Sequence, residues 1–236
     1  MKTRFAPSPT GYLHIGHIWS ALCVAAVAKA RDAAIHLRLE DHDKLRCSKH
    51  FADAIRSDLE WLGFEWQSES VQSERGKFYE KYFEILREKQ LLYELYKTEK
   101  PKIMLKNPES GDFAVKDAFG QWTYMFAVVV DDFEESIDLI VRGEDLMDSI
   151  DKQIYLAGIL GRTHKPLFIH HSLVYDANGK KLSKRDGSEG ICRERESGVS
   201  PKKVLSEICR RMLPGKDIPD EISWNEAVGF TILPPQ

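Results

Sequence analysis

The hydrophobic pattern of the first 90 residues alternates between strand and helix periods. A short strand is predicted over residues 3–6, followed by a loop rich in proline and glycine. Apolar residues then recur at helical spacing over residues 15–30 and alternate as in a strand over residues 35–39. Two more helical stripes occupy residues 51–62 and 78–86. The order β-α-β-α-α predicts the opening of a parallel α/β sheet.

The rest of the chain has a mixed pattern. Residues 95–111 contain several lysines and two prolines with little periodicity, which predicts a basic loop or a small insertion. Ser200 followed by Pro201 predicts the N-cap and first turn of a helix with its own apolar stripe. Strands are predicted over residues 113–115, 121–130, 137–142 and 167–174, and a helix over residues 150–160.

The composition of the 236 residues is 42% hydrophobic and 30% charged, which excludes a disordered or collagen-like chain. Lys and Arg total 34 and Asp and Glu total 37, so a nucleic-acid partner would need a local basic surface. The longest apolar run, residues 21–28, is too short to span a bilayer, so we expect no membrane partner. Prolines rather than an apolar segment follow Lys2 and Arg4, so no signal peptide is expected.

The four cysteines are scattered along the chain without a CxxC pair. This spacing favours a reduced, cytoplasmic location over a disulfide framework. It also predicts no structural zinc built from cysteines.

A candidate anion-binding motif, His14-Ile15-Gly16-His17, lies where the first predicted loop enters a helix. Helix N-termini attract anions through free backbone N–H groups and the helix dipole. Gly16 lets a ligand approach the backbone closely, and the two imidazoles are donors suited to phosphate oxygens. Taken alone, the motif is equally compatible with two surface histidines near a helix start.

A second candidate motif, residues 180–187, contains three lysines, an arginine and a serine. Flexible ammonium groups suit phosphates whose charge shifts during a reaction. Taken alone, this segment is typical of a solvated basic turn. The two motifs together predict a nucleotide site more specifically than either one does.

Several blocks of the sequence resemble one family. Residues 4–17 (RFAPSPTGYLHIGH) resemble the opening signature of glutamyl-tRNA synthetases, and residues 181–185 (KLSKR) resemble their second class I signature. Residues 37–41 and 140–145 match two further blocks of that family. Since the chain is short and has no room for an anticodon-binding domain, it most resembles the truncated paralogues, the glutamyl-queuosine tRNA(Asp) synthetases.

The resemblance implies a doubly wound, Rossmann-like parallel sheet that binds ATP and joins the carboxylate of L-glutamate to the α-phosphate. In such an enzyme catalysis is mainly positioning and electrostatic stabilisation. His14 and His17 would hold the triphosphate, Lys181 would contribute to ATP binding, and Lys184 would stabilise the leaving pyrophosphate. Magnesium would accompany ATP, held mainly by phosphates and water.

The resemblance also implies a glutamate pocket with complementary charges. Arg4 and Arg142 would face the substrate, where a guanidinium fork suits a carboxylate. Glutamine-specific relatives lack an arginine where Arg142 stands, so its presence favours glutamate. Glu40 would accept the ammonium group, and the remaining expected contacts are Ala6, Ser8 and Tyr124. The alternatives are ordinary ion pairs for the arginines and a core aromatic role for Tyr124.

The sequence departs from the family between Tyr93 and Tyr124, where the insertion that grips the tRNA acceptor end is usually longer. The paralogues often bind zinc there through cysteines and a tyrosine, but this segment has no cysteine, so metal binding is not expected. Its lysines are suited to tRNA phosphates or form a solvated face. Residues 1–92 and 121–198 would form two halves of a catalytic domain, residues 93–120 the shortened insertion and residues 199–236 a helical tail.

Three hypotheses remain open for the acceptor of glutamate. The acceptor is queuosine in tRNA(Asp), a tRNA 3′ end, or a molecule other than tRNA. The choice stays open because His17 and the lysine segment resemble full-length synthetases more than the truncated paralogues. The paralogues activate glutamate alone, whereas full-length synthetases generally need tRNA. A non-enzymatic regulator that binds tRNA or ATP is the remaining alternative. We expect a monomer.

Overall fold

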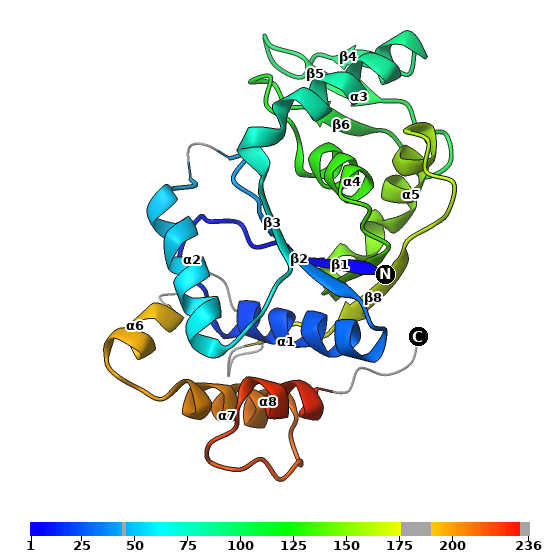
Figure 1. Ribbon diagram of the computed structural model, residues 1–236. Helices are drawn as coiled ribbons and strands as arrows, with labels where there is room; N and C mark the ends of the chain where they lie inside the picture. Colours follow the sequence, from blue (N-terminus) through cyan, green and yellow to red (C-terminus); the bar gives the residue numbers. More distant parts are fainter. Residues whose placement is uncertain (44–45, 176–189, 232–236) are drawn as a thin grey trace. The chain divides into compact units, whose positions relative to one another are not determined.

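The structure is a computed structural model that describes residues 1–43, 46–175 and 190–231. The chain divides into two compact units (Figure 1). Unit 1 comprises residues 1–71, 139–144 and 168–236, and unit 2 comprises residues 72–138 and 145–167. No helix among the described residues is long and apolar enough to cross a membrane. The division into four segments expected from the sequence stays a prediction.

Unit 1 is built on a five-stranded sheet with the order β3-β2-β1-β7-β8. The pairings β1–β2, β2–β3 and β1–β7 are parallel. Its strands are β1 (Lys2–Phe5), β2 (Ala34–Leu39), β3 (Ser68–Val71), β7 (Leu139–Gly143) and β8 (Leu167–His171), the last beginning one residue before the unit boundary. Strand order reverses at β1, and ligands of open α/β sheets bind beside the carboxyl ends of strands at such a point.

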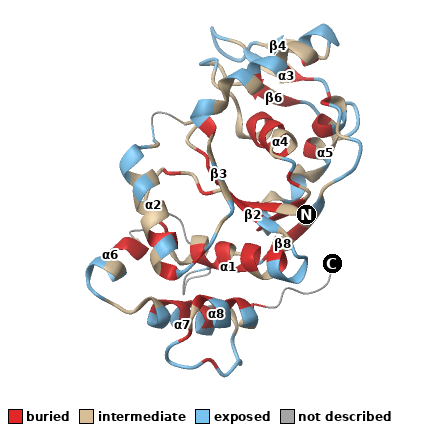
Figure 2. Cartoon of the chain, viewed as in Figure 1, coloured by how far each residue is buried: buried red, intermediate tan, exposed pale blue. Residues whose placement is uncertain are grey.

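The helices of unit 1 share one apolar core with the sheet. Helix α1 contacts β1, β2 and β7, and it also contacts α7 and α8 (Figure 1). It is therefore buried on several sides, which explains why its sequence is apolar nearly all round (Figure 2). The helices are α1 (Ile15–Ala30), α2 (Lys49–Leu62), α6 (Ile191–Glu196), α7 (Pro201–Met212) and α8 (Trp224–Phe230).

Unit 2 combines helices with a small antiparallel sheet of order β4-β5-β6. A second apolar cluster, which includes Phe126 and Val115, fills its core. Its elements are η1 (Gln72–Arg75), α3 (Gly76–Glu88), β4 (Leu92–Leu95), β5 (Lys102–Leu105), β6 (Phe113–Lys116), α4 (Tyr124–Glu134), η2 (Glu144–Ser149, starting at the end of unit 1) and α5 (Ile150–Ile159).

The structure confirms the α/β class and most predicted elements, but one strand prediction is wrong. Residues 121–130, which carry three consecutive valines, lie mostly in helix α4 rather than in a strand. Thr123 caps this helix, since its Oγ1 accepts a hydrogen bond from the Phe126 N–H at 3.4 Å. Burial of the valines in the core of unit 2 outweighs their intrinsic preference for strands.

Residues 95–111 are predicted to form a basic loop or a small insertion. The loop alternative is wrong, because β5 lies within this segment and pairs with both β4 and β6. Strands of four residues are too short to leave a clear period. The sequence pattern does not predict β3, β4, α6 or α8 either, and β3 is a polar edge strand. The predicted N-cap at Ser200 is confirmed by backbone position, although its side chain makes no capping hydrogen bond.

Candidate active site

The loop after β1 is held against the end of β2. Ser8 Oγ donates a hydrogen bond to the Glu40 carbonyl oxygen at 2.8 Å, and the Glu40 N–H donates to the Pro7 carbonyl at 3.1 Å. The Glu40 carboxylate lies 3.2 Å from Nη2 of Arg38. Arg38 is fully buried and Glu40 is 6% exposed. The sequence motif therefore places a buried carboxylate at the carboxyl end of β2, with a charged partner two positions before it on the same face.

Two arginines predicted to bind the substrate lie at neighbouring strands. Arg4 is 4% exposed and donates from Nη1 to the Val141 carbonyl at 3.3 Å. Arg142, the next residue of β7, is 5% exposed. Its Nε donates to Nε2 of His170 at 3.3 Å, and its guanidinium carbon lies 5.1 Å from the Phe168 ring centroid. Arg4, Ser8, Glu40 and Arg142 therefore lie in or directly after neighbouring strands of unit 1, at the point where strand order reverses. Ala6 directly follows β1 there.

The two motif histidines form a reciprocal cap on α1. Nδ1 of His14 accepts from the Gly16 N–H at 3.0 Å, and Nδ1 of His17 accepts from the His14 N–H at 3.1 Å. An accepting Nδ1 carries no proton, so the hydrogen of each neutral ring is on Nε2. A Cβ at Gly16 would lie 3.0 Å from the His14 ring, a tight contact that a larger residue would relieve only by displacing this ring. The sequence thus fixes two Nε2–H donors at a helix N-terminus, where anions bind favourably.

Helix α6 is hydrogen-bonded to the loop that precedes His14. The Ile191 N–H donates to the Leu13 carbonyl at 2.8 Å. Arg195 of α6 donates from Nε to a carboxylate oxygen of Asp58 in α2 at 3.0 Å. Burial raises the pKa of Asp58, against the hydrogen bond and charge of Arg195. Sequence reasoning missed this pair, because its members are 137 positions apart.

We expect Gly190→Ala to lower the free energy of unfolding by about 1–3 kcal/mol, the usual cost of forcing an extra group into a packed site. A Cβ there would clash with Cβ of Tyr12, so the start of α6 must move away from the loop that contains Tyr12. Urea unfolding measures the change. Gly158→Ala in α5 is the matched control, since a Cβ there meets no atom within 4 Å. An equally stable Gly190→Ala variant would show that this contact is dispensable.

The remaining predicted residues are placed differently. Tyr124 is the first residue of α4 in unit 2, where it is half-buried and packs against the core. Its expected contact with the amino acid stays a prediction, as does the alternative of a core aromatic. Lys181 and Lys184 lie outside the described residues. Among the residues that the structure describes, no group of three or more His, Cys, Asp or Glu side chains is arranged to hold a metal ion.

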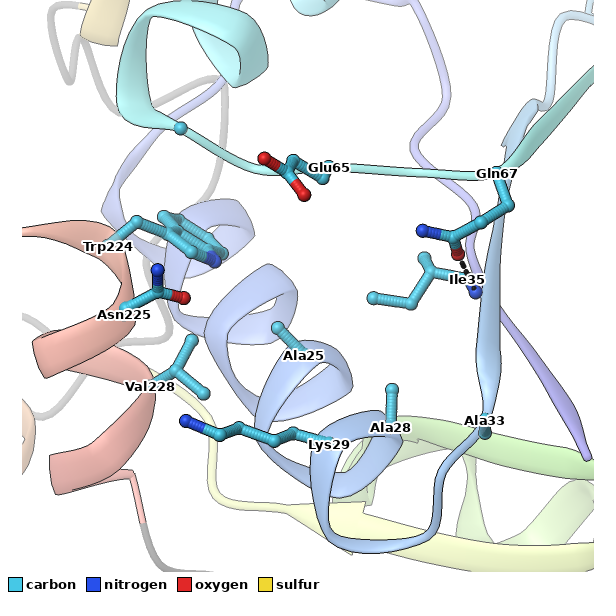
Figure 3. A pocket seen from close by; sticks show the side chains of 11 residues that line it. Ala25, Ala28, Lys29, Ala33, Ile35, Glu65, Gln67, Trp224, Asn225 and Val228 are labelled. Atoms are coloured by element: carbon cyan, nitrogen blue, oxygen red, sulfur yellow. Dashed lines mark hydrogen bonds between the residues drawn. The ribbon is translucent and has the colours of Figure 1, made fainter.

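Unit 1 also has a pocket of about 250 Å³ between α1 and α8 (Figure 3). Small side chains such as Ala25 and Ala28 leave the space, and Trp224 of α8 lies across from them. Gln67 beside it accepts a hydrogen bond from the Ile35 N–H at 2.7 Å. The sequence-predicted site residues that the structure describes do not line this pocket.

Comparison with known proteins identifies the class. Residues 1–101 and 100–228 match the family described as tRNA synthetases class I (E and Q), catalytic domain. The chain therefore belongs to the class I tRNA synthetase family of the glutamate and glutamine enzymes.

Individual relatives agree with this assignment. The chain is similar to glutamate–tRNA ligase 2 of Ruegeria sp. (strain TM1040), with 32% identity over 88% of this chain and 60% of that protein. Glutamate–tRNA ligase 2 of Rickettsia bellii is 33% identical over 88% of this chain and 57% of that protein. The chain thus spans about 60% of the length of these relatives.

Solved structures support the fold. The crystal structure of a glutamate tRNA ligase from Elizabethkingia meningosepticum, in complex with its amino acid, matches with a TM-score of 0.79 and 24% identity. The match covers 97% of this chain and 64% of that one. A glutamate-tRNA synthetase from Elizabethkingia anophelis matches with a TM-score of 0.78, also at 24% identity.

Proposed function

We propose that the protein activates L-glutamate with ATP and transfers the glutamyl group to queuosine in tRNA(Asp). In the first step a glutamate α-carboxylate oxygen attacks the α-phosphorus of ATP. The bond from that phosphorus to the oxygen that bridges to the β-phosphate breaks, and pyrophosphate leaves with its magnesium. In the second step an acceptor hydroxyl attacks the glutamyl carbonyl, AMP leaves and the hydroxyl proton is released.

The observation that supports the glutamate-activation step of the proposal is the set of buried charges where strand order reverses. Arg4, Glu40 and Arg142 are each at least 94% buried at neighbouring strands of unit 1. Glu40 is paired with Arg38, and Arg142 contacts His170 and Phe168. A zwitterion with two carboxylates complements two guanidinium groups and a carboxylate in charge. Arg4 and Arg142 would bind carboxylates and Glu40 the ammonium group.

The nucleotide half of the proposal depends on the histidine cap. Nε2–H donors of His14 and His17 at the N-terminus of α1 suit the oxygens of the triphosphate. Lys181 would add to ATP binding and Lys184 would stabilise the pyrophosphate as negative charge grows on it. Magnesium enters with ATP as part of the substrate. Ser8, Ala6 and Tyr124 stay proposed contacts of the amino acid.

Pyrophosphate exchange into ATP, measured with glutamate and with or without tRNA, tests the activation step. Exchange with glutamate alone is the expected result and favours the queuosine enzyme. Exchange only in the presence of tRNA favours a synthetase that charges a 3′ end. No exchange under either condition overturns the proposal and favours a regulator.

The acceptor is tested separately with labelled glutamate and tRNA(Asp) with or without queuosine. The expected result is label on the queuosine-bearing tRNA only, in the anticodon fragment after nuclease digestion. Label on the 3′-terminal fragment would instead support the second candidate, charging of a tRNA 3′ end. That candidate is favoured by the similarity to glutamate–tRNA ligases at 32–33% identity. Periodate oxidation alone does not distinguish them, because it attacks both diols.

A further inference from the structure

Strand β8 presents two planar side chains to the Arg142 guanidinium. Phe168 and His170 are two positions apart, so they lie on the same face of the strand. Both are half-buried, whereas Ile169 and His171 between and after them are buried on the other face. The Phe168 and His170 rings are nearly parallel, with centroids 6.4 Å apart and an interplanar angle of 5°.

The contact with His170 sets the direction of the guanidinium. Nε of Arg142 donates to Nε2 of His170 at 3.3 Å, and the guanidinium carbon lies 5.1 Å from the Phe168 centroid. A guanidinium is planar and rigid, so fixing its Nε fixes the plane and the aim of its two terminal nitrogens. Those nitrogens form the fork that pairs with both oxygens of a carboxylate.

The chemistry of His170 makes it suitable for this task. Because its Nε2 accepts a hydrogen bond, the ring is neutral and its hydrogen is on Nδ1. An aspartate or glutamate in the same place would pair with Arg142 and compete with an incoming carboxylate. A neutral acceptor instead orients the guanidinium without cancelling its positive charge.

We propose that His170 is a positioning residue that aims Arg142 at the side-chain carboxylate of glutamate, and is thereby a determinant of glutamate selection over glutamine. This inference rests on the proposed function. His170 acts through Arg142 and does not itself touch the substrate. Its removal should therefore weaken the binding of glutamate and leave that of ATP unchanged.

Two substitutions separate the acceptor from the ring. His170→Phe keeps a planar ring beside Phe168 but has no acceptor nitrogen. His170→Gln has no ring but offers an amide oxygen to Nε of Arg142. Pyrophosphate exchange gives kcat, KM for glutamate and KM for ATP for each variant, and the same assay with glutamine gives selectivity. His164→Phe is the control, since the His164 side chain is 67% exposed.

We expect His170→Phe to raise KM for glutamate about tenfold, the usual loss for a hydrogen bond to a charged group. KM for ATP should stay within about twofold, and preference for glutamate over glutamine should fall by a similar factor of about ten. His170→Gln should return KM for glutamate to within about threefold of the wild type. Thermal midpoints of all variants monitor folding.

Three results would overturn the inference. The first is a KM for glutamate in His170→Phe equal to that of the wild type. The second is an equal rise in KM for glutamate in His170→Phe and His170→Gln. The third is a rise in KM for ATP in His170→Phe that matches the rise in KM for glutamate. In each of these the wild type still exchanges with glutamate, so the proposed function survives. If the wild type shows no glutamate-dependent exchange, the proposed function fails and this inference fails with it.

Discussion

Replacing Asp131 by alanine will lower the free energy of unfolding by about 3–5 kcal/mol, the usual cost of removing one partner of a buried ion pair. The Asp131 side chain is fully buried in α4. Its carboxylate accepts hydrogen bonds from Gln72 Nε2 at 2.7 Å, Arg75 Nε at 2.6 Å and the Tyr79 hydroxyl at 2.9 Å. The substitution leaves three buried or half-buried donors without this acceptor, and it loosens η1 and α3 from α4.

Urea unfolding monitored by circular dichroism measures this loss. Asp131→Asn keeps one acceptor oxygen and should lose less stability than the alanine variant. Asp148→Ala, at an exposed position of η2, serves as the matched control and should change stability by less than about 0.5 kcal/mol. A loss below about 1 kcal/mol for Asp131→Ala would show that solvent or other side chains replace the carboxylate.

Arg142→Ala should lower kcat/KM for glutamate in pyrophosphate exchange by about a hundredfold, equivalent to ~2.8 kcal/mol at 1.4 kcal/mol per tenfold. The physical reason is the loss of a buried guanidinium that would pair with the substrate carboxylate. The preference for glutamate over glutamine should shrink with it, because a neutral amide loses less than a carboxylate does. Arg142→Lys keeps the charge but not the fork, so it should recover only part of the loss.

Arg87→Ala is the control for this experiment. Arg87 is an exposed residue of α3 that pairs with Glu84, and exposed pairs contribute little. Its kinetic constants should match those of the wild type. If Arg142→Ala lowers activity with glutamate and glutamine to the same extent, Arg142 does not select the side-chain carboxylate.

The sequence predicts best those elements whose side chains are buried in the apolar core of unit 1. The apolar residues of β2 alternate as in a strand, and α1 is a long apolar segment because the same core buries it on several sides. Helix α4 is different, because three successive valines favour a strand locally and only the core of unit 2 explains their helical form. Strand β3 is polar throughout most of its length, so its pairing with β2 leaves no hydrophobic pattern.

Some residues of the candidate site could likewise be predicted from the sequence, and others only from the structure. Arg4, Glu40 and Arg142 are predicted as a group because each belongs to a short family block. The structure places Arg4 in β1, Arg142 in β7 and Glu40 directly after β2, which are neighbouring strands. Their roles in binding stay predictions. His170 was not predictable from composition or charge. Two adjacent histidines in β8 point to opposite faces, and only the structure distinguishes the partner of Arg142 from His171, which bonds Ser20 Oγ at 3.0 Å.

The first segment of unit 2, residues 72–138, is inserted between β3 and β7, and this position bears on how freely the segment varies in length. The contact between Arg4 and Val141 joins residues 137 positions apart in the chain. The entropy of closing a loop depends only on the logarithm of its length, so doubling or halving that length changes the closure cost by about 0.6 kcal/mol. The free-energy cost of pairing β1 with β7 therefore depends only weakly on the length of the segment between them. An ancestor could lengthen or shorten that segment while β1 and β7 continued to pair.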